Sequence, residues 1–191
     1  IYLLQWITDG WEACIPYKGE NTSTKISVII AARNEEANIA NCLSSIYKNK
    51  YPKDLLEIIV VDDQSEDRTA AIVKEKIPQV TLLNTAKNQG KKAAIQLAAN
   101  YAQGELLMFT DSDCIVPETW IDTLVSNYDP KLVNLIAAPV QIDLEDTNLS
   151  RFQYLDVAAT MAVTANGILR NSYYSANGAN MAVNRKIFIE L

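Results

Sequence analysis

Asp111 and Asp113, separated by one residue, form the chemically most informative feature of the sequence. The two aspartates follow an apolar run at residues 105–110, and carboxylates in this arrangement can share one divalent cation. Hard oxygen ligands suit Mg²⁺ or Mn²⁺, which keep several waters and also bind the phosphates of a substrate. Taken alone, the triplet also fits a solvated loop or a helix cap, in which Asp113 begins the next helix.

A second acidic pair, Asp62 and Asp63, follows another apolar run at residues 57–61. Adjacent carboxylates at the edge of a sheet repel each other unless a cation or a hydrogen-bond donor compensates. A carboxylate can also accept the imide N–H of uracil, so this pair is a candidate for recognition of a nucleotide base. A turn with Asx hydrogen bonds is the structural alternative.

Two basic residues, Arg33 and Lys91, each follow the end of a predicted strand. Lys91 falls in the first turn of a predicted helix, where a cation is unfavourable against the helix dipole. That placement becomes favourable if the start of the helix, opened by Gly90, faces a diphosphate. Arg33 either reaches the same pocket or forms an ion pair with Glu35.

Composition and charge exclude several kinds of chemistry. The 191 residues carry 17 Lys and Arg against 23 Asp and Glu and contain no His, so His-based zinc sites, Ser-His-Asp triads and histidine bases are ruled out. The acidic balance argues against nucleic acid as a partner, because no basic stripe can displace phosphate counterions. Three cysteines without a C-x-x-C spacing indicate reduced thiols of a cytosolic compartment rather than a zinc or redox site.

Alternating strand and helix signals predict how these residues are positioned. We predict strands at residues 26–31, 57–61, 80–83, 105–110 and 134–142, and helices from a cap at Asn34 through Ile46 and at 69–77, 91–102, 117–128 and 149–169. Repeated β-α-β units predict an α/β fold, an open and mostly parallel sheet with helices on both faces. Ligands of such sheets bind beyond the carboxyl ends of the strands, so the polar residues above should meet in one site.

The first part of the chain differs in character. Residues 1–24 are predicted to be an apolar and linker lead-in to a domain at residues 25–191. The apolar stretch at residues 1–7 is too short to span a bilayer. It either packs on the domain or is the end of a membrane anchor, and the long helix at 149–169 also suggests work near a membrane. We expect the domain at the cytoplasmic face, anchored by segments outside this chain.

The motifs, in their order and spacing, resemble those of family 2 glycosyltransferases with the GT-A fold. The resemblance covers residues 25–190 and is carried by residues 26–34, 62–69, 88–91 and the D-x-D triplet. Residues 175–186 resemble the glycine-containing segment on the acceptor side of the family's site.

This resemblance implies transfer of a sugar from a nucleotide-diphosphate donor, usually a UDP-sugar, to a saccharide or lipid-linked acceptor with Mg²⁺ or Mn²⁺. Asp113 would be the main metal ligand, with Asp111 reaching the ribose or the metal. Asp63 would hold the uracil, with Asp62 beside it. The further positions that the resemblance implies are Ala31, Arg33, Glu35, Lys91 and Ser112 on the nucleotide side, and Asn177, Gly178, Ala179 and Asn180 on the acceptor side.

The catalytic base is not among these residues. Inverting members of the family use a carboxylate, usually in a Glu-Asp pair downstream of the glycine-containing segment. We expect it beyond Leu191, so that the chain holds the donor-binding part of an incomplete domain. The Gln-x-x-Arg-Trp signature of processive members is also missing.

Other functions fit part of the pattern. A nucleotidyltransferase combines a similar sheet, acidic metal ligands and a nucleotide, but usually has a glycine-rich basic loop where this chain has residues 31–34. A non-catalytic nucleotide-sugar binding fragment explains the same residues without turnover. A Rossmann dehydrogenase would need G-x-G-x-x-G after the first strand, and a receiver-like signalling module leaves the D-x-D and residues 134–191 unexplained.

Overall fold

The computed structural model describes residues 23–87, 89–170, 172 and 175–190, together with Gln5, Asp9 and Glu12. The predicted lead-in at residues 1–24 therefore lies almost wholly outside the described residues, as do Cys14, Asn88 and Leu191. The chain divides into two compact units, one over Lys18–Ile136 with Gly178–Leu191 and the other over Ile1–Tyr17 with Ala137–Asn177.

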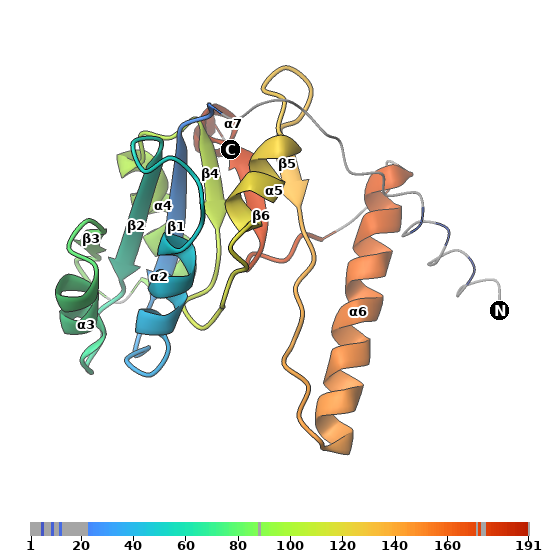
Figure 1. Cartoon of the computed structure of the whole chain (residues 1–191), viewed down its shortest axis with the longest axis horizontal. Coiled ribbons are helices and arrows are strands. Elements are labelled where there is room, and N and C mark those ends of the chain that lie inside the picture. The colour runs from blue at the N-terminus through green and yellow to red at the C-terminus, as the bar shows by residue number, and fades with distance from the viewer. Residues whose placement is uncertain are drawn as a thin grey trace. The chain divides into compact units, whose positions relative to one another are not determined.

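Six strands of the described residues form one sheet in the order β3-β2-β1-β4-β6-β5 (Figure 1). The strands are β1 (Ile26–Ala32), β2 (Leu56–Asp62), β3 (Thr81–Asn84), β4 (Leu106–Phe109), β5 (Leu135–Ala137) and β6 (Met181–Asn184). β1 pairs in parallel with β2 and β4, and β2 pairs in parallel with β3, whereas β6 runs antiparallel to β4. The predicted open and mostly parallel sheet is confirmed.

Helices lie on both faces of the sheet (Figure 1). In the unit that holds most of the sheet they are α2 (Ile39–Tyr47), α3 (Thr69–Lys76), α4 (Gly90–Tyr101), α5 (Trp120–Ser126) and α7 (Arg185–Glu190), whereas α6 (Asn148–Leu169) belongs to the other unit. α4 packs on β1 and β2 through alanines at 94, 98 and 99, which lie in one apolar cluster with Ile29, Ile59 and Phe109. Because successive strand residues point to opposite faces, Val28 and Ile30 are buried on the other side.

The sequence prediction is wrong at two places and incomplete at a third. Only Leu135–Ala137 of the predicted strand at 134–142 is a strand. Asn34 does not cap α2, because its φ of 56° is left-handed and the helix starts at Ile39, after Asn38. The prediction lacks β6 and α7, which follow each other directly, with no turn residue between them to separate a strand signal from a helix signal.

The other unit contains α6 and an extended segment before it. A mostly apolar cavity of about 360 Å³ is lined by residues 139–142 and, on α6, by Tyr154, Val157, Ala158 and Met161. Two large apolar side chains of the helix, Phe152 and Leu155, are exposed. No helix in the described part of the chain is both long and apolar enough to cross a membrane.

Gly104 allows the chain to pass against the central strand before it enters β4. A Cβ added there would lie 2.4 Å from the backbone nitrogen of Ser27 and 2.6 Å from the carbonyl carbon of Ile26. The glycine N–H also donates to Ser27 Oγ at 2.8 Å. No side chain fits at residue 104 unless β1 moves.

We expect Gly104→Ala to lower the free energy of unfolding by about 3 kcal/mol, as overpacking against a buried backbone does. Urea denaturation measures this change. Gly178→Ala is the matched control, because a Cβ at residue 178 would meet nothing within 4 Å. Equal stability of the two variants would contradict the expected clash.

Candidate functional site

A cavity of about 300 Å³ opens at the carboxyl ends of β1, β2 and β4. It is lined by Ala31, Ala32, Arg33, Glu35, Asp63, Gly90, Lys91, Asp111, Ser112 and Asp113. These positions meet because parallel pairing aligns the ends of the strands, with Ala32 opposite Asp62 and Ile29 opposite Phe109. Every residue predicted for the nucleotide side or the metal lines this cavity, except Asp62.

Asp63 joins the end of β2 to the start of α4. Its Oδ1 accepts hydrogen bonds from Thr85 Oγ1 at 2.6 Å and from the Gln89 N–H at 3.1 Å, and its Oδ2 accepts from the Gly90 N–H at 2.8 Å. The Thr85 hydroxyl, followed by the two backbone donors, holds the pKa of Asp63 below its ordinary value, and the charge of Arg33 acts in the same direction. The carboxylate is therefore ionised and already hydrogen-bonded within the fold.

Asp62 is buried beside the cavity rather than in its wall. The Ser65 N–H lies 3.3 and 3.4 Å from its two carboxylate oxygens. Both carboxylates of the acidic pair thus accept hydrogen bonds from N–H groups. These hydrogen bonds offset the repulsion between the two negative charges, which is one of the two possibilities stated from the sequence. Asp62 thus bonds locally, to an N–H three residues on rather than the two of an Asx-turn, and of the pair only Asp63 lines the cavity.

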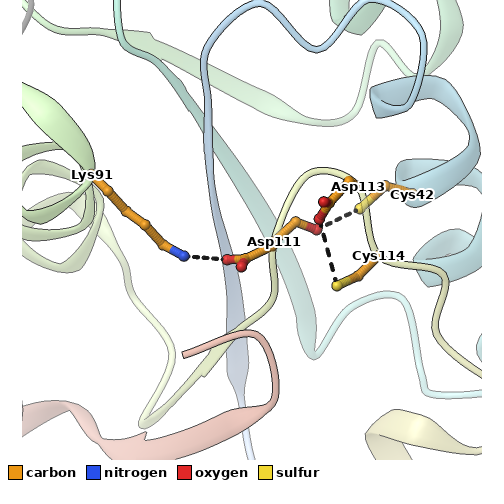
Figure 2. A network of polar contacts seen from close by, with 5 residues as sticks. All are labelled: Cys42, Lys91, Asp111, Asp113 and Cys114. Carbon is orange, nitrogen blue, oxygen red and sulfur yellow. Dashed lines mark hydrogen bonds and ion pairs between the residues drawn. The ribbon is translucent and has the colours of Figure 1, made fainter. Parts of the chain in front are cut away.

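Lys91 forms an ion pair with Asp111 across the cavity (Figure 2). The ammonium comes from the first turn of α4, which begins at Gly90, a glycine in the left-handed conformation with φ of 81°. Figure 2 places Asp113 on the far side of Asp111 from the lysine. The D-x-D turn thus has a cation on one side and an exposed carboxylate on the other.

Two thiols flank the same turn. The Cys42 thiol donates to the carbonyl oxygen of Asp111 at 3.5 Å, and the Cys114 thiol lies 3.8 Å from Asp113 Oδ1 (Figure 2). Burial raises the pKa of Cys42 to about 12 and also raises the pKa of Cys114. Both are free thiols that remain protonated at neutral pH, so they act as hydrogen-bond donors rather than as thiolate ligands.

The loop after β1 is bound to the loop after β2. The Asn34 N–H donates to Ser65 Oγ at 3.0 Å, and the Glu66 N–H donates to Asn34 Oδ1 at 2.8 Å. No ion pair joins Arg33 to Glu35 in the described structure, and both residues line the cavity. Asn34 was predicted to cap a helix. Instead it joins the two loops beside the cavity, and its hydrogen-bond partners lie more than 30 residues away in the sequence.

The predicted acceptor-side residues are not among those that line this cavity. Gly178, Ala179 and Asn180 precede β6, and none of them lines the cavity. Trp120, the first residue of α5, donates its Nε1–H to Asn180 Oδ1 at 2.8 Å. Asn177 belongs to the other unit.

The donor set of the D-x-D turn fits a metal only together with a phosphorylated ligand. Nowhere in the described residues do three or more His, Cys, Asp or Glu side chains gather as a metal-binding group. Asp111 and Asp113 nevertheless match the needs of Mg²⁺ or Mn²⁺, which take one or two carboxylates and complete their shell with water and phosphate oxygens.

Comparison with known proteins gives consistent matches. A family model described as "Glycosyl transferase family 2" matches residues 27–191. The probable glycosyltransferase YdaM of Bacillus subtilis is 31% identical over 194 residues, covering 95% of this chain and 46% of the relative. The chain spans less than half the length of the first curated relatives that it matches.

Solved structures match in the same way. A mannosyltransferase from Pyrobaculum calidifontis, PcManGT in complex with GDP-Man and Mn²⁺, superimposes with a TM-score of 0.73 at 24% identity, over 98% of this chain and 53% of that one. This likeness shows the fold. TarS 1–349 of S. aureus in complex with UDP-GlcNAc matches with a TM-score of 0.57 at 27% identity, over 64% of this chain and 36% of that one.

We expect Asp63→Asn to destabilise the protein at neutral pH, because the amide replaces a carboxylate that accepts three hydrogen bonds. Since the folded pKa of Asp63 lies below the ordinary 3.8, its contribution is fully present above pH 3.8 and is lost as the pH falls through the folded value. Urea denaturation across the acid range should show the difference between wild type and variant shrinking below pH 3.8.

The same substitution at the exposed Asp54 controls for the change in net charge. A stability difference for Asp63→Asn that stayed constant into acid would contradict this account of the carboxylate.

Proposed function

The chain belongs to glycosyl transferase family 2 and has the GT-A fold, and on that premise we propose that it binds a nucleotide-diphosphate sugar and transfers the sugar to an acceptor. The observation that carries the proposal is the convergence of Asp63, Lys91 and the D-x-D aspartates on one cavity. Asp63 matches the N–H of the base, Lys91 matches the phosphates, and the D-x-D aspartates match the metal that the phosphates bind.

The hydrogen bonds of Asp63 favour uracil as the base. A carboxylate offers about four lone-pair sites, and the described residues fill both on Oδ1 and one on Oδ2. The remaining site on Oδ2 matches the single imide N–H of uracil. Guanine presents two adjacent donors, of which one would stay unpaired at a cost in affinity. We therefore propose a UDP-sugar, a donor class supported by the UDP-GlcNAc complex of TarS.

Asp111 and Asp113 would hold Mg²⁺ or Mn²⁺, which when bound stabilises the negative charge that develops on the leaving diphosphate. Lys91 already faces Asp111, so a diphosphate in the cavity would compete with Asp111 for the same ammonium. The lysine would then donate to a phosphate oxygen as a charge-assisted hydrogen bond. Asp63 would accept from the base, and Arg33 and Glu35 would border it.

We propose an inverting reaction with a carboxylate base supplied from beyond Leu191. Four carboxylates of the described residues line the cavity, and each already has a partner or a proposed role. Asp63 accepts three hydrogen bonds, Asp111 pairs with Lys91, and Glu35 accepts from Asn38 Nδ2 at 3.0 Å, while Asp113 is the proposed main metal ligand. The chemistry usual in the family supports this assignment. The acceptor side would lie toward residues 177–180, which precede β6.

The proposed acceptor is a saccharide or a lipid-linked saccharide, handled at the cytoplasmic face of a membrane. Exposed Leu149, Phe152 and Leu155 on α6 support a position close to lipid. The second candidate function for residues 1–191 is binding of a nucleotide sugar without catalysis, since the proposed catalytic carboxylate lies outside these residues.

The first test is calorimetric titration of UDP into the chain with Mn²⁺ and then with EDTA. We expect Mn²⁺ to strengthen UDP binding, and Asp113→Asn to remove most of that gain, because the metal then lacks its main carboxylate. GDP should bind more weakly than UDP, by about tenfold for one unpaired donor.

Asp54→Asn serves again as the control for net charge. If the affinity for UDP depends on neither the metal nor Asp113, the D-x-D is a structural turn rather than a metal site. Equal affinity for GDP and UDP would refute the assignment of uracil as the base.

Replacement of Lys91 separates phosphate recognition from base recognition. We expect Lys91→Gln to weaken UDP binding about tenfold, since it removes a charged hydrogen-bond donor, while uridine binding stays unchanged. Lys92→Gln is the matched control, because Lys92 is exposed and does not line the cavity. Equal losses for UDP and uridine in Lys91→Gln would instead indicate damage to the base pocket.

A further inference from the structure

One face of α2 and the turn that ends it carry a row of buried polar side chains. Cys42, Ser45 and Asn49 follow each other at spacings of three and four residues, which place them above one another on a helical surface. Their exposed fractions are 0%, 8% and 2%. Buried polar groups need partners, and each of the three has at least one partner in residues 111–121, the segment that follows β4.

The first two members bind the beginning of this segment. The Cys42 thiol donates to the carbonyl oxygen of Asp111. Ser45 Oγ accepts from the Val116 N–H at 3.1 Å and donates to the carbonyl oxygen of Cys42 at 2.7 Å. The Ser45 hydroxyl therefore links the helix to the loop directly after the D-x-D turn.

Asn49 binds the end of the segment with both atoms of its amide. Its Nδ2 donates to the carbonyl oxygen of Pro117 at 3.2 Å, and its Oδ1 accepts from the Ile121 N–H at 3.0 Å. This fixes the first turn of α5, whose Trp120 also bonds to Asn180 beside β6. The row thus extends from the metal-ligand turn to the start of α5.

The segment needs such external bonds because it has little regular structure of its own. Residues 110–119 are neither helix nor strand. Their backbone bonds to one another and to α5 include Cys114 N–H to Asp111 and Trp120 N–H to Pro117. A loop without a helical or sheet ladder keeps one conformation only where side chains of a rigid element satisfy its backbone groups.

We propose that Cys42, Ser45 and Asn49 are positioning residues that hold the D-x-D turn in the geometry in which Asp111 and Asp113 bind metal. The proposal rests on the proposed function, because it assigns the metal to these two aspartates. Groups that orient metal ligands typically change metal affinity by 10–100-fold when removed. The row would therefore act on the metal-dependent part of donor binding and not on the contacts of the base.

The experiment compares Ser45→Ala with Ser44→Ala, the same substitution at neighbouring positions of α2. Ser44 is exposed, and its hydroxyl donates to the carbonyl oxygen of Ala40 within the same helix. We expect Ser45→Ala to lower the Mn²⁺-dependent gain in UDP affinity about tenfold while UDP binding in EDTA is unchanged. Ser44→Ala should behave as wild type in both titrations.

Hydrogen–deuterium exchange provides a readout that needs no nucleotide. We expect amides of residues 111–119 to exchange faster in Ser45→Ala than in Ser44→Ala, since the Val116 N–H loses its acceptor. If the wild-type chain shows no metal-dependent UDP binding, the proposed function fails and exchange alone decides the inference. Unchanged exchange and unchanged metal dependence in Ser45→Ala would overturn it.

A second pair of variants covers the case in which Ser45→Ala does not fold. Cys42→Ser keeps a donor for the Asp111 carbonyl oxygen, whereas Cys42→Ala removes it. We expect the serine variant to retain most of the Mn²⁺-dependent gain and the alanine variant to lose it. Equal gains in these two variants would refute the role of Cys42 in positioning the turn.

Discussion

The parallel pairing of β1 with a strand on each side is the constraint on which the site depends. β1 is buried along its length and aligns residue by residue with β2 and β4, so the loops that follow these strands leave the sheet at the same edge. Asp63 and Asp111, nearly 50 residues apart in the chain, are brought to one cavity in this way. Hydrophobic burial of the strands therefore sets the distances between the polar groups that follow them.

Folding and recognition use the same carboxylate at Asp63. Three of its lone-pair sites satisfy Thr85 and the first amides of α4, which fixes the start of that helix and with it Lys91. Only one acceptor site of the Asp63 carboxylate is therefore left for a ligand. The selectivity that we propose for uracil is thus a consequence of how the helix is capped, because a carboxylate with fewer internal bonds could pair with two donors.

The sheet and most helices were predictable because their signals are local. A continuous β-branched run predicts a strand buried on both faces, and β1 is that strand. The errors arose where local signals are ambiguous. Asn34 has the residue type of a helix cap, but its left-handed backbone and its bond to the Glu66 N–H depend on a distant loop. Residues after β5 have strand-like composition, yet the strand is only three residues long.

The sequence by itself determined which residue types follow each strand, and hence that carboxylates and a lysine would share one edge of a parallel sheet. Only the tertiary structure decided which of the adjacent acids faces the cavity, since Asp62 is buried and bonded to Ser65 while Asp63 lines the cavity wall. It also decided the roles of Ser45 and Asn49, which in the sequence are ordinary polar residues near a helix end. The reason is physical: hydrogen bonds form over about 3 Å, and the packing of distant segments alone sets such distances.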